Sequence, residues 1–451
     1  MFTISKFHFL GQRIRRNNIP RLVLLDADGV LWEDGAGLLT SKHFVLPEIT
    51  SDILKTFGKD THVVVVTNQT SYANGRMGII PFLFRIHINS WKLLNATSIK
   101  AVIVCCHHPK SDRLFAKRKC KCRKPQSAML DKALRYLNPV KTLTYFVGDR
   151  ISDAEAANRA QVKNVYLLLN SRLFERNVMF HKFEPLPTIR FEILRNFNEF
   201  PKVFFDNPQS QAQLLILAAG EGRRLRPLTL EIPKPVISLG EQTIISRILR
   251  QFSRQEFVIY VNISYLAPFF VHHLYESKLP SLRIVFLFEV NPLGTTNTVL
   301  SLLRHSPSPT LVLHGDLVFS SESAEHLIKT FLESHTSTIF YHLRMRSESR
   351  SMLTLKEDIV QSFQELQKSL LKESDKAVMV NSGAYIFHPN ILENNYDLQI
   401  KSDLGESLIP DLVLRKQLTG IPWKGVRFSV DSFDSLEKAV HFVEHDELHD
   451  S

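Results

Sequence analysis

Two aspartates one residue apart, Asp26 and Asp28, follow the apolar run 22–25. The run predicts a buried strand of a parallel sheet, and such sheets bind ligands at the carboxyl ends of their strands. Two carboxylates at that edge can divide the roles of nucleophile and general acid beside a Mg²⁺ ion. For this segment alone, an Asp-Gly turn that follows a strand is an equally good interpretation.

Other predicted strands of the first half also end in polar groups. The β-branched run 62–66 is followed by a hydroxyl and two amides, and the run 143–147 is followed by two carboxylates. Two cations lie between these runs, just before Pro125. The polar residues are Thr67, Asn68, Gln69, Arg123, Lys124, Asp149 and Asp153. Hydroxyls, amides and cations of this kind bind phosphate oxygens, so the set indicates chemistry on a phosphate group.

The second half opens on a glycine-rich loop. Apolar residues 214–217 predict another buried strand, which is followed by Gly220, Gly222 and three arginines within 223–226. Bare backbone N–H groups in such a loop can hold phosphate oxygens, and the arginines add positive charge. A simple strand-to-helix turn would use the same glycines, so the loop alone does not decide between the two interpretations.

Composition limits the class of protein. A chain of 451 residues is long enough for two or three domains. It has no run of about twenty apolar residues, and its basic start lacks the apolar core of a signal peptide, so we expect a cytoplasmic protein without a membrane span. The formal net charge is +11, but the basic residues are scattered, which argues against nucleic acid as a partner.

The strand-end residues of the first half resemble the haloacid-dehalogenase (HAD) superfamily of phosphatases. The resemblance implies that Asp26 is the nucleophile, that Asp28 protonates the leaving oxygen, and that Lys124 neutralises the phosphoryl charge. The implied phosphate-binding or substrate-binding residues are Thr67, Asn68, Gln69 and Arg123. The implied Mg²⁺ ligands are Asp26, the carbonyl of Asp28, Asp149 and Asp153, the last either as a ligand or as a support for the others. Departures from the family pattern are Ala27 in place of arginine and Trp32 in place of asparagine, with Arg76 as a candidate replacement for the arginine.

The four cysteines lie in one short segment, 105–122, and this clustering favours a metal site over disulfide bonds in a cytosolic chain. The segment resembles the zinc loop of heptose-bisphosphate and histidinol-phosphate phosphatases. That resemblance implies a closed, structural Zn²⁺ site with four ligands, which would hold Arg123 and Lys124 against the substrate. The implied ligands are Cys105, His107, Cys120 and Cys122, and Cys106 is left over as a packed residue.

Residues 220–229 and 233–235 resemble the signature of the sugar-1-phosphate nucleotidylyltransferases. The resemblance implies that Gly220, Gly222 and Arg224 bind a nucleoside triphosphate and that Lys234 binds the attacking phosphate. The implied Mg²⁺ ligands are Asp316, which follows the predicted strand 310–313, and Asp431, with Asp434 as the alternative to Asp431. The implied contacts to nucleobase and sugar are Glu289, Gly294, Asn381, Gly383 and Glu406. Departures are Arg223 in place of a small hydroxyl residue, Asn297 in place of glycine, and Leu366 in place of a phosphate-binding lysine, with Lys368 nearby.

The two resemblances predict two doubly wound, mostly parallel α/β domains, a HAD-like Rossmannoid followed by a Rossmann-like nucleotide-diphospho-sugar transferase. The predicted boundaries are an N-terminal extension at 1–20, a phosphatase domain with the zinc loop at 21–170, a connector at 171–211, and a transferase domain at 212–451. We expect a helix near residues 189–197 in the connector.

The predicted function follows from joining the two chemistries. Removal of the 7-phosphate from D-glycero-D-manno-heptose 1,7-bisphosphate would leave a sugar 1-phosphate, the acceptor that a nucleotidylyltransferase uses. We therefore expect a bifunctional enzyme of activated-heptose synthesis that uses Mg²⁺ in both domains, with GTP as the preferred donor. The alternatives are the same activities on another sugar such as a hexose 1-phosphate, a nucleic-acid 3′-phosphatase, and a scaffold in which one domain has lost activity.

Overall fold

The computed structural model contains two compact units, residues Met1–Pro208 (unit 1) and Gln209–Ser451 (unit 2). Each unit is described by itself below. The structure describes the chain except for residues 1, 6–20, 33–45, 59, 117–119, 141–142, 171–172, 175–187, 196, 202–211, 254–256, 278–281, 293, 346–350, 366–376, 395, 397–401 and 447–451.

Unit 1 is built on a mostly parallel sheet with the strand order β1-β4-β3-β2-β5-β6-β7. Chain order runs outward from β2 to β3 and β4 on one side, and from β5 to β6 and β7 on the other, so the sheet is doubly wound with its switch point between β2 and β5. The antiparallel β1 closes one edge. The strands are β1 Phe2–Ser5, β2 Arg21–Leu25, β3 Thr61–Asn68, β4 Ile99–Cys105, β5 Thr144–Gly148, β6 Asn164–Leu168 and β7 Thr188–Leu194.

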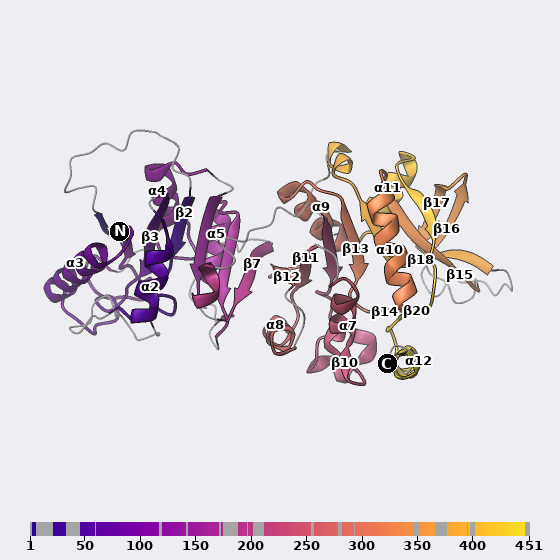
Figure 1. Ribbon diagram of the computed structural model, residues 1–451, viewed down its shortest axis with the longest axis horizontal. Helices are drawn as coiled ribbons and strands as arrows, with labels where there is room; N and C mark the ends of the chain where they lie inside the picture. Colours follow the sequence, from indigo (N-terminus) through magenta and orange to yellow (C-terminus); the bar gives the residue numbers. More distant parts are fainter. Residues whose placement is uncertain are drawn as a thin grey trace. The chain divides into compact units, whose positions relative to one another are not determined.

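Helices pack on this sheet and cover its apolar strands (Figure 1). Helix α3 contacts β4 and β1, α4 contacts β3 and β4, and α5 contacts β5, β6 and β7. The strands β2, β5 and β6 are buried along most or all of their length, as expected for a parallel sheet covered on its faces. The helices are α2 Glu48–Thr56, α3 Ile79–Ala96, α4 Ala128–Leu137 and α5 Ile151–Arg159.

The expected helix near residues 189–197 is wrong, because the segment Thr188–Leu194 forms β7 and pairs in parallel with β6. Its buried residues include Ile189 and Phe191, which are two positions apart. That spacing places both side chains on one face of a strand, where they can pack on α5. Phe200, just beyond it, is fully buried against Tyr145 and Tyr166 and so belongs to the core of unit 1.

Unit 2 has a mixed sheet in the order β12-β11-β8-β13-β18-β15-β19-β17-β16. Its first four strands are parallel, and chain order again diverges on the two sides of β8, which places a switch point between β8 and β13. The strands are β8 Gln213–Leu217, β11 Val258–Ile263, β12 Arg283–Glu289, β13 Thr310–His314, β15 Thr338–Met345, β16 Ser351–Lys356, β17 Ile359–Glu365, β18 Ala377–Phe387 and β19 Thr419–Pro422. A separate ribbon pairs β14 Leu317–Phe319 with β20 Arg427–Ser429.

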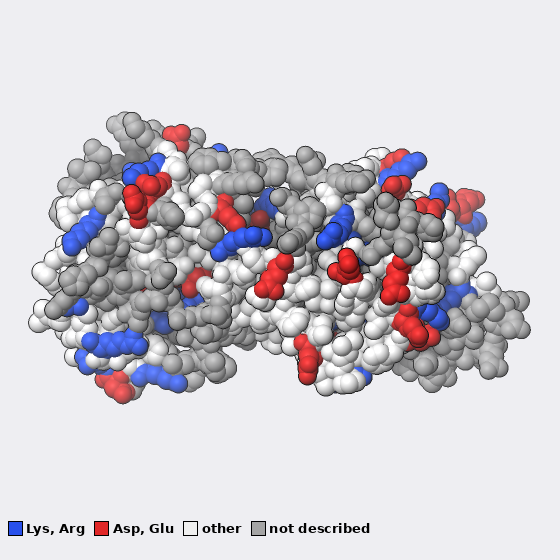
Figure 2. Space-filling model, turned by 60° about the horizontal axis from the view of Figure 1, so that its bottom comes forward, with Lys and Arg blue, Asp and Glu red and all other residues white. Residues whose placement is uncertain are grey.

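Helices complete unit 2, and they are α7 Ile244–Gln251, α8 Ala267–Glu276, α9 Thr295–His305, α10 Ser321–Glu333, α11 Leu408–Leu414 and α12 Phe433–Asp446. Among the described residues of both units, no helix has the length and apolar character that crossing a membrane requires. On the face shown in Figure 2, described Lys and Arg side chains lie interspersed with Asp and Glu side chains.

Candidate active sites

The first site lies at the switch point of unit 1, where β2 ends at Asp26. Lys124 is buried between two carboxylates, with its Nζ 2.8 Å from Asp26 Oδ1 and 2.7 Å from Asp153 Oδ1. Burial opposes the charge of Lys124, but Asp153 and Asp26 outweigh it and raise the pKa of the lysine. The structure therefore brings together two predicted carboxylates and the predicted cation.

A third carboxylate, Asp149, joins this cluster from the end of β5. Carboxylate oxygens of Asp26, Asp149 and Asp153 lie within 4.8 Å of one another, and all three residues are buried. Burial raises the pKa of Asp26 to about 7 and that of Asp149 to about 8. Asp149 Oδ1 is buried without a hydrogen-bond partner among the described residues. Three oxygen donors, one of them unpaired, fit a hard divalent cation such as Mg²⁺.

Asp28 is held beside the cluster by two side chains. Trp32 Nε1 donates to Asp28 Oδ1 at 2.7 Å, and Gln69 Nε2 donates to Asp28 Oδ2 at 2.8 Å. Burial raises the pKa of Asp28 even though both hydrogen bonds oppose the rise, and a raised pKa suits a general acid. Trp32, which departs from the family pattern, thus takes a positioning role that the sequence did not reveal.

The two amides predicted to bind phosphate, those of Asn68 and Gln69, form hydrogen bonds with other residues of unit 1 in this structure. Asn68 Oδ1 accepts a hydrogen bond from the backbone N–H of Lys124 at 3.2 Å, and Asn68 Nδ2 donates to the Lys124 carbonyl at 3.4 Å. Gln69 also donates to Thr67 Oγ1, at 3.1 Å. The amides therefore position Lys124, Asp28 and Thr67, and the predicted direct phosphate contact of Asn68 and Gln69 stays a prediction.

The four predicted zinc ligands converge at the end of β4. The Sγ atom of Cys105 lies 3.8 Å from that of Cys120 and 3.4 Å from that of Cys122, and His107 Nδ1 lies 3.2 Å from Cys122 Sγ. A tetrahedral zinc with Zn–S bonds of ~2.3 Å would hold its sulfur ligands about 3.8 Å apart. The donor set and its spacing therefore fit zinc. Arg123, beside the loop, is buried and donates to the His107 carbonyl at 3.3 Å.

Replacing one of these ligands should remove the metal. We expect Cys120→Ser to lower bound zinc from about one ion per chain to a small fraction, and to lower thermal stability, because a structural zinc contributes directly to folding. Mass spectrometry of metal content and thermal unfolding would measure both effects.

Cys106→Ser is the matched control, since Cys106 is buried but lies outside the four-ligand cluster. It should retain the zinc. A wild-type chain that carries no zinc and keeps its thermal stability after chelation would contradict the ligand assignment.

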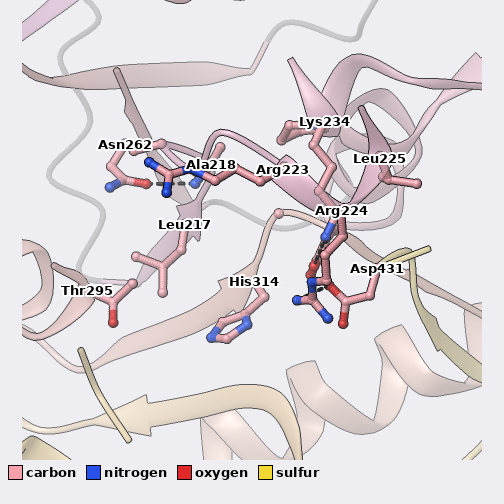
Figure 3. A pocket seen from close by; sticks show the side chains of 16 residues that line it. Leu217, Ala218, Arg223, Arg224, Leu225, Lys234, Asn262, Thr295, His314 and Asp431 are labelled. Atoms are coloured by element: carbon pink, nitrogen blue, oxygen red, sulfur yellow. Dashed lines mark hydrogen bonds and ion pairs between the residues drawn. The ribbon is translucent and has the colours of Figure 1, made fainter. Parts of the chain in front are cut away.

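The second site is a cavity of about 320 Å³ at the switch point of unit 2 (Figure 3). The glycine-rich loop after β8 forms one wall, and the ends of β11 and β13 contribute others. Predicted residues that line it are Gly220, Gly222, Arg224, Lys234, Asp316 and Asp431. Lining residues that the sequence did not single out as site residues include Asn262, Thr295 and His314.

Two carboxylates meet two cations in this cavity. Lys234 Nζ is bonded to Asp316 Oδ2 and lies 3.0 Å from Asp431 Oδ1, and Arg224 lies 2.8 Å from the same Asp431 oxygen (Figure 3). Asp316 Oδ1 is buried without a hydrogen-bond partner among the described residues, which fits a place for a divalent cation. Asp434, the alternative to Asp431, is exposed and bonds Lys438 at 2.9 Å.

The shape of the loop depends on Gly222 and Asn262. Gly222 has a φ of +61°, and a Cβ there would lie 3.1 Å from the Cβ of Lys234, so glycine lets the lysine approach the loop. Asn262, buried at the end of β11, accepts a hydrogen bond from the Ala218 N–H at 2.6 Å. The sequence feature that could have revealed this role is an amide within an otherwise apolar run.

All five predicted sugar-side residues lie outside the lining of this cavity. Glu289 is buried and bonds Thr298 and Asn262, so it positions the amide that holds the loop. Asn381 bonds Gly383 and Tyr385 within its own strand. Glu406 is exposed. The departures at Leu366 and Lys368 lie outside the described residues.

The departure in the glycine-rich loop, Arg223, has a local partner. Arg223 is exposed and bonds Glu221 at 2.8 Å, and Arg226 bonds the same carboxylate at 2.9 Å. The additional charge at position 223 is therefore partly neutralised by Glu221.

Gly294 sits where the chain enters α9, with a φ of +94°. A Cβ there would collide with the backbone carbonyl of Ser402. We expect Gly294→Ala to destabilise unit 2 by about 2–4 kcal/mol, because both the backbone conformation and the close approach exclude a side chain. Chemical denaturation would measure the loss. Gly240→Ala is the control, since its φ is also positive (+84°) but a Cβ there meets no atom within 4 Å. Equal losses in the two variants would contradict the steric part of the argument.

Comparison with known proteins agrees with the division of the chain into two units. A protein-family model for nucleotidyl transferases matches residues 213–426, and one for HAD-hydrolase-like proteins matches residues 121–170. The D-glycero-beta-D-manno-heptose-1,7-bisphosphate 7-phosphatase of Escherichia coli K12 is 30% identical over 142 residues, which are 31% of this chain and 74% of that protein. The chain joins a heptose-bisphosphate-phosphatase-family unit of HAD type to a nucleotidyl transferase unit.

A curated guanylyltransferase and a solved structure are also similar to part of this chain. The mannose-1-phosphate guanylyltransferase catalytic subunit beta of Dictyostelium discoideum is 31% identical over 193 residues, 40% of this chain and 50% of that protein. The solved structure of HddC from Yersinia pseudotuberculosis aligns with 51% of this chain and 99% of its own at 20% identity and a TM-score of 0.44. The chain spans about half the length of the first curated relatives that it matches.

Proposed function

We propose that this protein is a bifunctional enzyme of nucleotide-activated heptose synthesis. Unit 1 would remove the 7-phosphate of D-glycero-D-manno-heptose 1,7-bisphosphate. Unit 2 would transfer a nucleotidyl group, with GTP as the preferred donor, to the resulting sugar 1-phosphate and release pyrophosphate. The observation that carries the proposal is that each unit holds a lysine between two carboxylates at the switch point of its sheet, Lys124 in unit 1 and Lys234 in unit 2.

In unit 1, the geometry supports a nucleophilic aspartate. Asp26 Oδ1 accepts hydrogen bonds from the Ala27 N–H and from Lys124, so Oδ2 is the oxygen available to attack a phosphoryl group. Asp28, with its raised pKa, would protonate the leaving sugar oxygen. A Mg²⁺ ion held by Asp26, Asp149 and Asp153 would neutralise phosphate charge, and the zinc loop would keep Arg123 and Lys124 in place.

In unit 2, the chemistry needs positioning and charge neutralisation. The loop at Gly220–Gly222 and Arg224 would bind the triphosphate, and Asp316 with Asp431 would hold Mg²⁺. The phosphate oxygen of the sugar 1-phosphate would then attack the α-phosphorus, and the bond to pyrophosphate would break. We also propose a cytoplasmic location, because clustered thiols that bind zinc persist in a reducing compartment.

Incubation with heptose 1,7-bisphosphate and each nucleoside triphosphate in turn tests the proposal. Mass spectrometry should show heptose 1-phosphate when no nucleotide is present, and GDP-heptose with equimolar pyrophosphate when GTP is added. Activity with mannose 1-phosphate or glucose 1-phosphate in preference to the heptose would favour the alternative acceptor, a hexose, which the guanylyltransferase relative also suggests. Release of phosphate from 3′-phosphorylated oligonucleotides alone would contradict the proposal.

A further inference from the structure

Arg427 lies near the carboxylate pair Asp316 and Asp431 of unit 2 and takes no part in the reaction proposed above. Arg427 and Ser429 are two residues apart in β20, so their side chains leave the same face of the strand, about 7 Å apart along it. Ser429 Oγ lies 3.4 Å from Asp316 Oδ2 and 3.1 Å from Asp431 Oδ2. The Arg427 side chain therefore starts next to the carboxylates that line the cavity.

The surroundings of Arg427 are polar. Among the described residues no carboxylate pairs with it directly, although the charges of Asp316 and Asp431 lie close enough to favour its charged form. Its Nη1 lies 3.1 Å from Nδ1 and 3.0 Å from Nε2 of His342, and its guanidinium lies 5.8 Å from the centre of the Trp423 ring. His342 Nδ1 in turn lies 3.0 Å from Ser382 Oγ. Burial, with the Arg427 charge as the next cause, lowers the pKa of His342 to about 3, so the imidazole is neutral and cannot repel the arginine.

The other cations of the site are already paired. Lys234 bonds both Asp316 and Asp431, and Arg224 bonds Asp431. By contrast, in the part of the chain that the structure describes, Arg427 makes no ion pair, and its Nε is buried without a hydrogen-bond partner. Burial lowers the pKa of Arg427 to about 10, which leaves it charged at neutral pH. A partly buried cation that makes no direct ion pair is costly, and an anionic ligand would offset that cost.

The position of Arg427 indicates which phosphate it would bind. The glycine-rich loop that would hold the triphosphate follows β8, next to β13 in the sheet. His342 and Ser382, the partners of Arg427, lie on the neighbouring strands β15 and β18, where the sequence predicts sugar contacts at Asn381 and Gly383. Arg427 therefore lies toward the sugar side of the two aspartates.

We propose that Arg427 binds the phosphate group of the sugar 1-phosphate, with His342 and Ser382 orienting its guanidinium. The planar guanidinium carries its N–H donors in a fixed fork and can donate to two phosphate oxygens together, which a lysine at the same position could not do. This inference rests on the proposed nucleotidyl transfer in unit 2.

Steady-state kinetics of pyrophosphate release, with GTP and heptose 1-phosphate as probes, test this role. We expect Arg427→Gln to raise the KM for the sugar 1-phosphate roughly 10- to 100-fold, the loss expected for a charged hydrogen bond, and to leave the KM for GTP within about twofold. Arg427→Lys should give a smaller rise, because it keeps the charge but loses the fork. Arg415→Gln is the control, since Arg415 is a surface residue of unit 2 paired with Asp411.

The outcomes are separable. An unchanged KM for heptose 1-phosphate in Arg427→Gln would overturn the inference, and so would a parallel rise in both KM values, which would indicate a structural role. If Arg427→Gln fails to bind GTP because it does not fold, Arg427→Lys decides, since it must still raise only the KM for the sugar 1-phosphate. A wild-type protein that releases no pyrophosphate with any sugar 1-phosphate and any nucleoside triphosphate would instead contradict the proposed function itself.

Discussion

Asp26→Asn is expected to reduce phosphate release from heptose 1,7-bisphosphate by about a thousandfold or more, while pyrophosphate release from GTP and heptose 1-phosphate stays unchanged. The amide cannot attack phosphorus as a carboxylate does, and it removes one of the two anions that bracket Lys124. Pyrophosphate release should survive because every residue of the second site lies in unit 2. Parallel assays of phosphate and pyrophosphate on the same preparation would measure the split.

Asp52→Asn on α2 is a matched control for this variant. Asp52 is exposed and, among the described residues, pairs only with Lys55 at 2.7 Å, so the same chemical change there should alter neither activity. Circular dichroism and thermal unfolding of Asp26→Asn would show whether the loss is chemical. Equal loss of both activities in a folded Asp26→Asn protein would contradict two independent sites.

The strands that carry the sites could be predicted from the sequence because each is a short apolar run that ends in a polar group. The predicted run 22–25 corresponds to β2 Arg21–Leu25, and the predicted run 310–313 corresponds to β13 Thr310–His314. The predicted and observed strands therefore differ only at their ends. The close spacing of the cysteines in the sequence also located their cluster, whose four predicted zinc ligands span only 18 residues. A local sequence pattern was therefore sufficient to locate the polar residues that directly follow a strand.

What the sequence could not reveal depends on contacts between distant segments. Asn68 clamps the backbone of Lys124, 56 residues away, and Gln69 holds Asp28, 41 residues away, so both amides are engaged in ways that a motif does not show. Strand β7 was mistaken for a helix because its alternation is short and its partner β6 lies on the far side of residues 175–187. The unpaired state of Arg427 likewise follows only from the arrangement of β15, β18 and β20.

The second large effect is expected in unit 2. Asp316→Asn should reduce pyrophosphate release by roughly a hundredfold or more and leave phosphate release from the bisphosphate unchanged, because electrostatic groups beside a transferring phosphoryl group contribute about 3–4 kcal/mol each. The substitution removes a carboxylate that bonds Lys234 and whose second oxygen is buried and unpaired, the oxygen best placed for a divalent cation. Titration of Mg²⁺ should therefore show a higher half-saturating concentration in the variant as well as a lower maximal rate.

Asp434→Asn controls for this experiment because it makes the same change three residues from Asp431, at an exposed carboxylate that bonds only Lys438 among the described contacts. It should retain full pyrophosphate release and an unchanged Mg²⁺ requirement. If Asp434→Asn were impaired and Asp316→Asn were not, the cation would have to bind away from the cavity at the end of β13. If both were fully active, the carboxylates of this cavity would serve only to hold Lys234 and Arg224, and the charge for nucleotidyl transfer would have to come from the glycine-rich loop and its arginines alone.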